Sequence, residues 1–177
     1  MDFVEFWSIY RPKWTVETYI VIAVISAIVF FILLQKKSKK QWIAGYILLV
    51  YLIFVFASTV FTRHVTTGKH YESEIFWSYT RGIDTYGIEM VHEIVLNILM
   101  LMPIGVLFPI VIKRSRHKMI LTVVFGILIT VSIELLQLIM QRGLCEFDDM
   151  IHNTLGVILG YGLYHIVILI RKVTIHS

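Results

Sequence analysis

The sequence predicts an all-α fold, a polytopic membrane helix bundle with five transmembrane helices. The mean hydropathy is +0.79, and 58% of the 177 residues are hydrophobic, more than an ordinary soluble domain carries. Five apolar runs also reach roughly 20 residues, the length that crosses a hydrocarbon core of about 30 Å. At this length the chain is expected to form a single domain over residues 1–177. The five runs cover about residues 15–34, 42–61, 92–112, 119–141 and 150–170.

The distribution of charge predicts how these helices are oriented. The chain holds 16 basic and 12 acidic residues, which gives a net charge of +4. Ten of the basic residues fall in three segments that contain no acid, namely 36–40, 113–118 and Arg171–Lys172. Basic segments beside membrane helices face the cytoplasm, so the N-terminus is predicted outside and the C-terminus inside. The positive balance is therefore a topology signal, and no nucleic-acid partner is expected.

The first two helices are predicted to carry little chemistry of their own. The first is rich in Ile, Val and Phe and fills space. The second ends with the small residues Ala57, Ser58 and Thr59, which allow another helix to approach closely. Arg63 follows at its outer end, where it either reaches headgroup phosphates or serves as an anion ligand.

The longest loop, residues 64–89, is predicted to lie over the outer ends of the helices. It is too aromatic for a flexible tether, because it combines several acids with Tyr71, Trp77, Tyr79 and Tyr86. Such a composition indicates a lid or a re-entrant cap.

The third helix places polar side chains in an apolar stretch. Glu93 and Asn97 are four residues apart and therefore share one helix face. Pro103 removes a backbone hydrogen bond near the middle of the helix, which predicts a kink.

The fourth and fifth helices carry the strongest functional signal. Glu134 and Gln137 share one face of the fourth helix, and a carboxylate within a membrane helix costs about 2.5–3.5 kcal/mol on insertion scales. In the fifth helix, Asp149, Asn153, Gly156 and Gly160 form a single stripe. The spacing of the two glycines lets another helix approach closely, and packing within the chain is favoured over a dimer contact.

Asn97, Glu134 and Asn153 are predicted to lie at a similar depth. Each is four to eight residues from the outer end of its helix, which corresponds to roughly 6–12 Å below the outer surface. This agreement predicts a shallow polar pocket that opens outward, ringed by Arg63, Arg142, Asp148 and Asp149.

Structural explanations of the same residues remain open. Glu134 with Arg63 or Arg142 could be an ion pair that fixes helix packing, and Asn97 and Asn153 could be hydrogen-bond links between helices. His152 is expected to face lipid headgroups. No spacing of His or Cys typical of a metal site occurs, so no metal and no cofactor are predicted.

The residues of helices three to five also resemble the VanZ-like family of small membrane proteins. The resemblance covers about Phe61 to Tyr161 and lies in three stretches, NILMLMPIGVLFPI, SIELLQLIMQR and FDDMIHNTLGVILGY. The acidic stretch from Cys145 to Asp148 departs from the family pattern. The matching positions are Asn97, Pro103, Gly105, Glu134, Gln137, Arg142, Asp149, Asn153, Thr154, Gly156 and Gly160, and Arg63 also fits.

The resemblance implies a multi-pass protein of the bacterial cytoplasmic membrane, associated in Gram-positive bacteria with resistance to teicoplanin and related lipoglycopeptides. Two main hypotheses for the chemistry remain open, and the sequence does not decide between them or give the oligomeric state. In the first, the pocket binds an anionic cell-envelope lipid or the drug through Arg63, Asn97, Gln137, Arg142, Asp148 and Asn153. In the second, the protein is an intramembrane enzyme that acts on a lipid-linked phosphate or envelope precursor, with Glu134 and Asp149 as catalytic residues. A third, a proton- or ion-coupled flippase, is weaker, because five helices without inverted repeats are poorly suited to alternating access.

Overall fold

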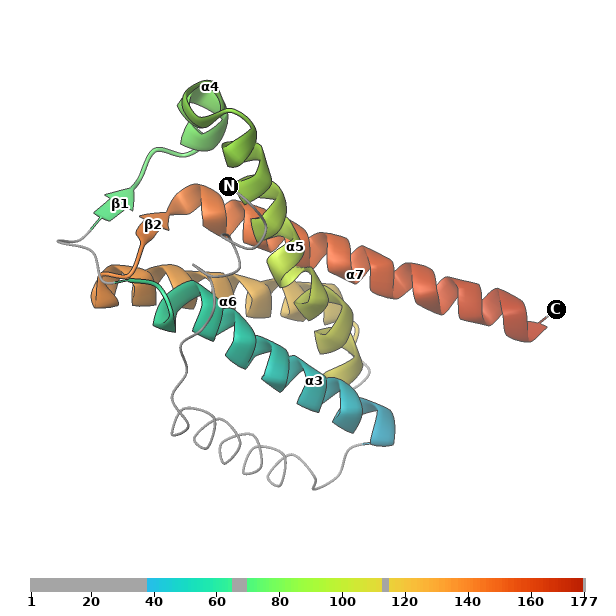
Figure 1. The fold of residues 1–177 in the computed structure, drawn as a ribbon. Coiled ribbons are helices and arrows are strands. Elements are labelled where there is room, and N and C mark those ends of the chain that lie inside the picture. Colours follow the sequence, from blue (N-terminus) through green and yellow to red (C-terminus); the bar gives the residue numbers. More distant parts are fainter. Residues whose placement is uncertain (1–37, 65–69, 113–114, 177) are drawn as a thin grey trace, which may run out of the picture. The chain divides into compact units, whose positions relative to one another are not determined.

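The structure is a computed structural model that describes residues 38–64, 70–112 and 115–176. These residues form five α-helices, two short π-helical turns and two short strands (Figure 1). The predicted all-α class is confirmed. The predicted helix at 15–34 lies outside the described residues.

Four helices of the described part are long and apolar enough to cross a membrane, and they correspond to the other four predicted helices. They are Lys39–Phe61, Ile88–Val111, Lys118–Met140 and Phe147–Thr174. The chain is therefore a multi-pass membrane protein. The fifth span and the orientation of the termini stay predictions.

The chain divides into two compact units, which are described separately. Unit 1 comprises Met1–Tyr71 and Ile133–Cys145, and unit 2 comprises Glu72–Ser132 and Glu146–Ser177. Helix α6 (Lys118–Met140) belongs to unit 2 up to Ser132 and to unit 1 from Ile133 onward. The prediction of one domain over residues 1–177 stays a prediction.

Unit 1 is built on α3 (Lys39–Phe56), which continues into the π-helical turn η1 (Ala57–Phe61). A capping box fixes the start of α3, because Ser38 and Gln41 each accept a hydrogen bond from the backbone N–H of the other. Two strands that the sequence did not predict, β1 (His70–Glu72) and β2 (Leu144–Glu146), pair in a small sheet.

Unit 2 is organised by the crossing of α5 (Ile88–Val111) and α7 (Phe147–His176), which Figure 1 shows. A side chain at Gly156 would collide with the carbonyl oxygen of Ile98, and one at Gly160 with that of Met102. Gly105 of α5 similarly meets the backbone of α7. The two backbones are thus in contact, and the expected packing of Gly156 and Gly160 within the chain is confirmed.

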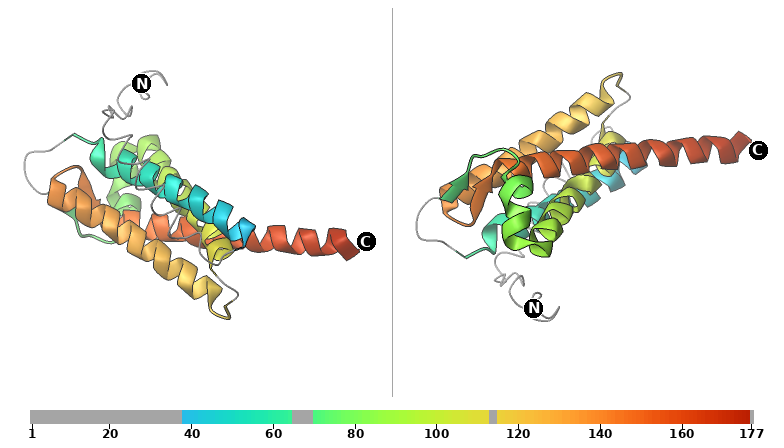
Figure 2. Two further views of the ribbon diagram at one scale, coloured as in Figure 1. Left: turned by 90° about the horizontal axis from the view of Figure 1, so that it is seen from below. Right: turned by 90° about the horizontal axis from the view of Figure 1, so that it is seen from above.

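The remaining helical packing of unit 2 involves α6 and the far end of α7. Gly126 of α6 lies against the side chain of Val157, and Phe125 stacks on Phe108 of α5 with ring centroids 4.2 Å apart. Figure 2 shows that the C-terminal half of α7 continues away from α5. Its apolar side chains there, such as Leu169 and Ile170, are exposed, as expected of a helix in lipid.

The segment before α5 forms a compact cap, defined here as residues 74–87 of unit 2. It contains the π-helical turn η2 (Ser78–Gly82) and the short helix α4 (Ile83–Tyr86). Gly87 has φ +59°, a conformation that L side chains rarely adopt, and it separates α4 from α5.

Candidate functional site

The cap is attached to the first turn of α7 through Asp148. This carboxylate is 1% exposed. It accepts hydrogen bonds from the backbone N–H groups of Phe76 (2.6 Å) and Ser78 (3.0 Å) and from the Ser78 hydroxyl. Phe76 has φ +66°, and this left-handed residue turns the backbone so that both N–H groups reach one carboxylate. Asp148, predicted as a ligand-binding residue, therefore has the cap as its partner within unit 2.

Two further side chains beside Asp148 hold the cap. The Trp77 indole donates to Glu146 at 3.0 Å, and the Tyr79 hydroxyl lies 2.8 Å from His152 Nε2. His152 is 2% exposed, so the expectation that it faces lipid headgroups is wrong. The helical turn that places Asp148 under the cap also directs His152, four residues later, toward Tyr79.

Tyr79 in the Tyr79–His152 pair is held in its neutral form. Burial and the Asp148 carboxylate both raise the pKa of Tyr79, so the neutral phenol is favoured. His152 Nδ1 is buried and has no hydrogen-bond partner among the described residues.

Asn97 and Asp149, both predicted site residues, are brought together in unit 2. The Asn97 amide donates to Asp149 Oδ1 at 2.6 Å, which joins the third turn of α5 to the first turn of α7. Both side chains are half-buried. The glycine contacts between α5 and α7 set the register in which this pair forms, because they fix how far the helices slide past each other.

Asn153, one helical turn further along α7, bonds to a residue that the sequence analysis did not single out. Its amide nitrogen donates to the Thr130 hydroxyl at 2.9 Å. Asn153 is 1% exposed and Thr130 is fully buried. Asn153 Oδ1 has no partner among the residues that the structure describes. Thr130 could have been found from its spacing, because it lies four residues before Glu134 on the same helix face.

Glu134 and Gln137 occupy the part of α6 that belongs to unit 1. Their exposures are 1% and 3%, as predicted for a polar face turned away from lipid. Gln137 Nε2 donates to the carbonyl oxygen of Thr59 at 3.0 Å. Gln137 Oε1 is buried and has no partner within the described ranges.

The carbonyl that Gln137 binds lies in the π-helical turn η1. There the Thr62 N–H bonds to Ala57 O at 3.0 Å, five residues back, and the Thr59 hydroxyl bonds to Val55 O at 2.8 Å. Turns of this kind redirect backbone groups and occur frequently at functional sites. No sequence signal predicted η1 beyond the small residues at 57–59.

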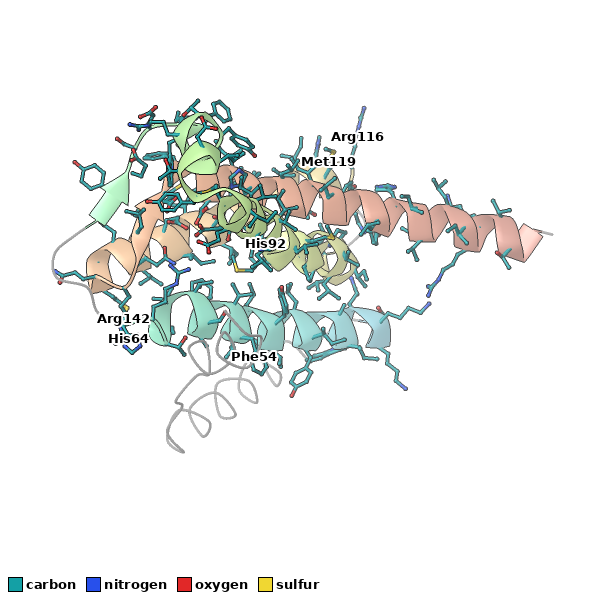
Figure 3. All side chains as sticks on the ribbon, turned by 45° about the horizontal axis from the view of Figure 1, so that its top comes forward. Phe54, His64, His92, Arg116, Met119 and Arg142 are labelled. Carbon is teal, nitrogen blue, oxygen red and sulfur yellow. The ribbon has the colours of Figure 1, made fainter. Side chains whose placement is uncertain are left out.

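Both arginines that were predicted to bind anions lie at the end of η1, in unit 1. Arg142 donates to the carbonyl oxygen of Phe61, and Figure 3 shows it at the end of the α3–η1 helix, where His64 also lies. Arg63 borders Gly143, because a Cβ on that glycine would lie 2.7 Å from Arg63 Nη1. The turn after α6, with Gln141 and Gly143 both at positive φ, brings Gly143 to this position.

The predicted site residues thus divide between the units. Asn97, Asp148, Asp149 and Asn153 belong to unit 2, and Arg63, Glu134, Gln137 and Arg142 belong to unit 1. The gathering of Asn97, Glu134 and Asn153 in one chamber stays a prediction, and so do their roles. Within the described residues no group of three or more His, Cys, Asp or Glu side chains is placed to hold a metal ion.

A comparison with protein families finds that the model of the VanZ/LLP1 family matches residues 42–169. The matched region contains all eight predicted site residues. Neither the curated proteins nor the solved structures gave a match.

Proposed function

This chain belongs to the VanZ/LLP1 family, and on that premise we propose that it binds an anionic cell-envelope lipid, or a lipoglycopeptide drug, in an outward-facing polar pocket. By this binding it contributes to resistance against glycopeptides of the teicoplanin type. We propose five transmembrane spans, with the N-terminus outside and the C-terminus in the cytoplasm.

The observation that carries this proposal is a pair of buried amide oxygens. Gln137 Oε1 and Asn153 Oδ1 lie in membrane-spanning helices, and neither has a hydrogen-bond partner among the described residues. Leaving a buried polar group unsatisfied costs about 1–3 kcal/mol. A ligand group that donates a hydrogen bond to either oxygen would remove that cost, so their presence supports a binding role.

The basic residues support an anionic ligand. Arg63 lies two residues beyond the span that ends at Phe61, the depth at which headgroup phosphates are found. Guanidinium groups bind phosphate oxygens through paired N–H donors, and Arg63 and Arg142 are proposed as the anion ligands. Asn97, Gln137 and Asn153 are proposed to bind polar groups of the ligand, and Asp148 to act through the cap that it holds.

The two ends of unit 2 support the proposed orientation. Lys118 Nζ donates to Pro109 O at 2.8 Å and lies 5.9 Å from the ring centre of Tyr164. Tyr164 is 16 residues after Asp148, or about 24 Å along α7, which is comparable to a hydrocarbon core of about 30 Å. This separation supports placing the basic loop and the cap on opposite sides of a membrane, with the basic loop in the cytoplasm.

Substitution of Glu134 tests the proposal. Glu134→Gln keeps the size of the side chain and removes its charge, so we expect loss of teicoplanin resistance in a susceptible host while the protein still inserts at the normal level. Lipids that copurify with the protein should be depleted of anionic species in the variant. Full resistance together with unchanged lipid content would count against the site.

An enzymatic role is the second candidate, and the Asn97–Asp149 pair favours it. A carboxylate held by an amide at 2.6 Å is oriented as a general base requires. In this mechanism Glu134 and Asp149 are catalytic and act on a lipid-linked phosphate. Incubation of the purified protein with labelled lipid precursors, with and without added metal ions, separates the candidates, because turnover is expected only of an enzyme.

A further inference from the structure

Gly143 in unit 1 lets two polar side chains lie close to the backbone. Its φ is +129°, a conformation that favours glycine. A Cβ placed on it would lie 2.7 Å from Arg63 Nη1 and 3.7 Å from Gln137 Cδ. The Arg63 guanidinium and the Gln137 amide thus border the same point, and any larger residue at 143 would displace the arginine.

The Gln137 amide, which lies beside Gly143, has a hydrogen-bond acceptor without a described partner. Its nitrogen is fixed by the bond to Thr59 O, since a carbonyl oxygen can face only the N–H side of an amide. The opposite atom, Oε1, is therefore the one without a described partner, and the side chain is only 3% exposed. A ligand bound here must donate a hydrogen bond to Oε1.

The Arg63 guanidinium, which also borders Gly143, is a cationic donor. Its side chain is exposed, and it forms no hydrogen bond or ion pair with any other described residue. Arg142 differs, because it already donates to the backbone carbonyl of Phe61. Of these two arginines, Arg63 is thus the one available to a ligand oxyanion.

We propose that Arg63, Gln137 and Gly143 form a subsite for a phosphate group that carries a neighbouring hydroxyl. Arg63 binds the phosphate oxygens and Gln137 Oε1 accepts a hydrogen bond from the hydroxyl, and the missing side chain at 143 lets both side chains lie near one point. This inference rests on the proposed function and specifies its ligand as a phosphate–polyol headgroup, such as phosphoglycerol. Headgroups that end in an ammonium are disfavoured, because Arg63 repels a second cation.

Two lipids of equal charge test the hydroxyl requirement. Phosphatidylglycerol and phosphatidylethanol are both phosphodiester monoanions, and only the first has hydroxyl groups in its headgroup. We would measure how each displaces phosphatidylcholine from the purified full-length protein in nanodiscs, by mass spectrometry of the bound lipid. One added hydrogen bond predicts a preference of about two- to tenfold for phosphatidylglycerol.

Substitutions assign the preference to the two side chains. In Gln137→Met the protein should still bind anionic lipid and lose the preference between the two lipids, whereas a purely structural role of Gln137 would weaken both equally. Arg63→Gln should weaken both anionic lipids together. Arg81→Gln serves as the matched control, because Arg81 is an exposed arginine of the cap that pairs with Glu74 and lies in unit 2. This control should leave both affinities unchanged.

The outcomes separate this inference from the proposed function. Binding of anionic lipid without a preference between the two would overturn the hydroxyl subsite and leave the proposed function standing. No preference for either anionic lipid over phosphatidylcholine would overturn both. Competition with soluble glycerol phosphate distinguishes the source: displacement is expected if the headgroup alone is recognised, and its absence, with the preference intact, assigns the site to the membrane lipid.

Discussion

The buried polar groups of the two units are used in different ways. In unit 2, Asp148 binds three donors of the cap, and Asn97 binds Asp149. In unit 1, Gln137 and Arg142 bind backbone carbonyls of the π-helical turn. Unit 2 thus joins its polar side chains to a folded cap, whereas unit 1 joins its polar side chains to an irregular helix end.

This difference indicates which residues are expected to bind a ligand and which are expected to hold the structure. Asp148 already accepts three hydrogen bonds from the cap, so replacing it should disturb the structure of the cap before any chemistry. Gln137 Oε1 and the Arg63 guanidinium have no described partner. Replacing these residues should therefore weaken ligand binding more than it disturbs the folded structure. The predictions below test the residues that have structural roles. They begin with the contact between α5 and α7, on which unit 2 depends most.

Gly156→Leu should give the largest effect, loss of the folded membrane protein. A side chain at 156 collides with the backbone carbonyl of Ile98, which cannot move aside as a flexible side chain would. Overpacking of this kind costs about 3 kcal/mol or more. The measurement is the yield of monodisperse protein after detergent extraction and its thermal unfolding.

Gly162→Leu is the matched control for this prediction. It adds the same side chain to the same helix, at a glycine whose Cβ would meet no atom within 4 Å. The control should retain the yield and unfolding temperature of the wild type. Equal loss in both variants would show that the effect comes from the residue type and not from the α5–α7 contact.

Asp148→Ala should give the next largest effect, release of the cap. Phe76 and Ser78 would lose the carboxylate that accepts from their N–H groups, and hydrogen bonds to charged groups contribute about 1.5–3 kcal/mol each. Hydrogen exchange of peptides from residues 74–87 should accelerate by roughly ten- to a hundredfold. Asp84→Ala, which removes an exposed acid of the same cap, should leave the exchange unchanged.

The helices and their small-residue contacts could be predicted from the sequence, because apolar length and spacing are local signals. The run at 42–61 matches Lys39–Phe61 closely, and 119–141 matches Lys118–Met140. The last helix was predicted as 150–170 and extends over Phe147–His176. Its earlier start follows from the cap, since Asp148 in the first turn is held by residues about 70 positions away in the chain.

The partners of the site residues could not be predicted in the same way. The donors that reach Asp148 depend on the left-handed backbone of Phe76. A phenylalanine does not predict that conformation. The π-helical turn likewise depends on Gln137 and Arg142, which come some 80 residues after it. The polar residues of the apolar helices could be found from the sequence. Their hydrogen-bond partners could not, because those partners come from distant parts of the chain.

The smallest predicted effect concerns the pH dependence of the Tyr79–His152 contact. Burial and the Asp148 carboxylate raise the pKa of Tyr79 in the folded protein above its unfolded value near 10. Between these two pKa values the unfolded chain loses a proton that the folded chain keeps. This contribution to stability is therefore fully present below about pH 10 and is lost as the pH rises from there through the folded pKa.

Tyr79→Phe should remove this part of the pH dependence and keep the aromatic contact with His152, whose ring centroid lies 5.5 Å away. The measurement is denaturant unfolding of the purified protein on both sides of pH 10, comparing variant with wild type. The wild type should lose stability across this interval more steeply than the variant. Parallel curves would mean that the Tyr79 hydroxyl is solvated in the folded state, and the cap would then depend on Asp148 and Glu146 without help from His152.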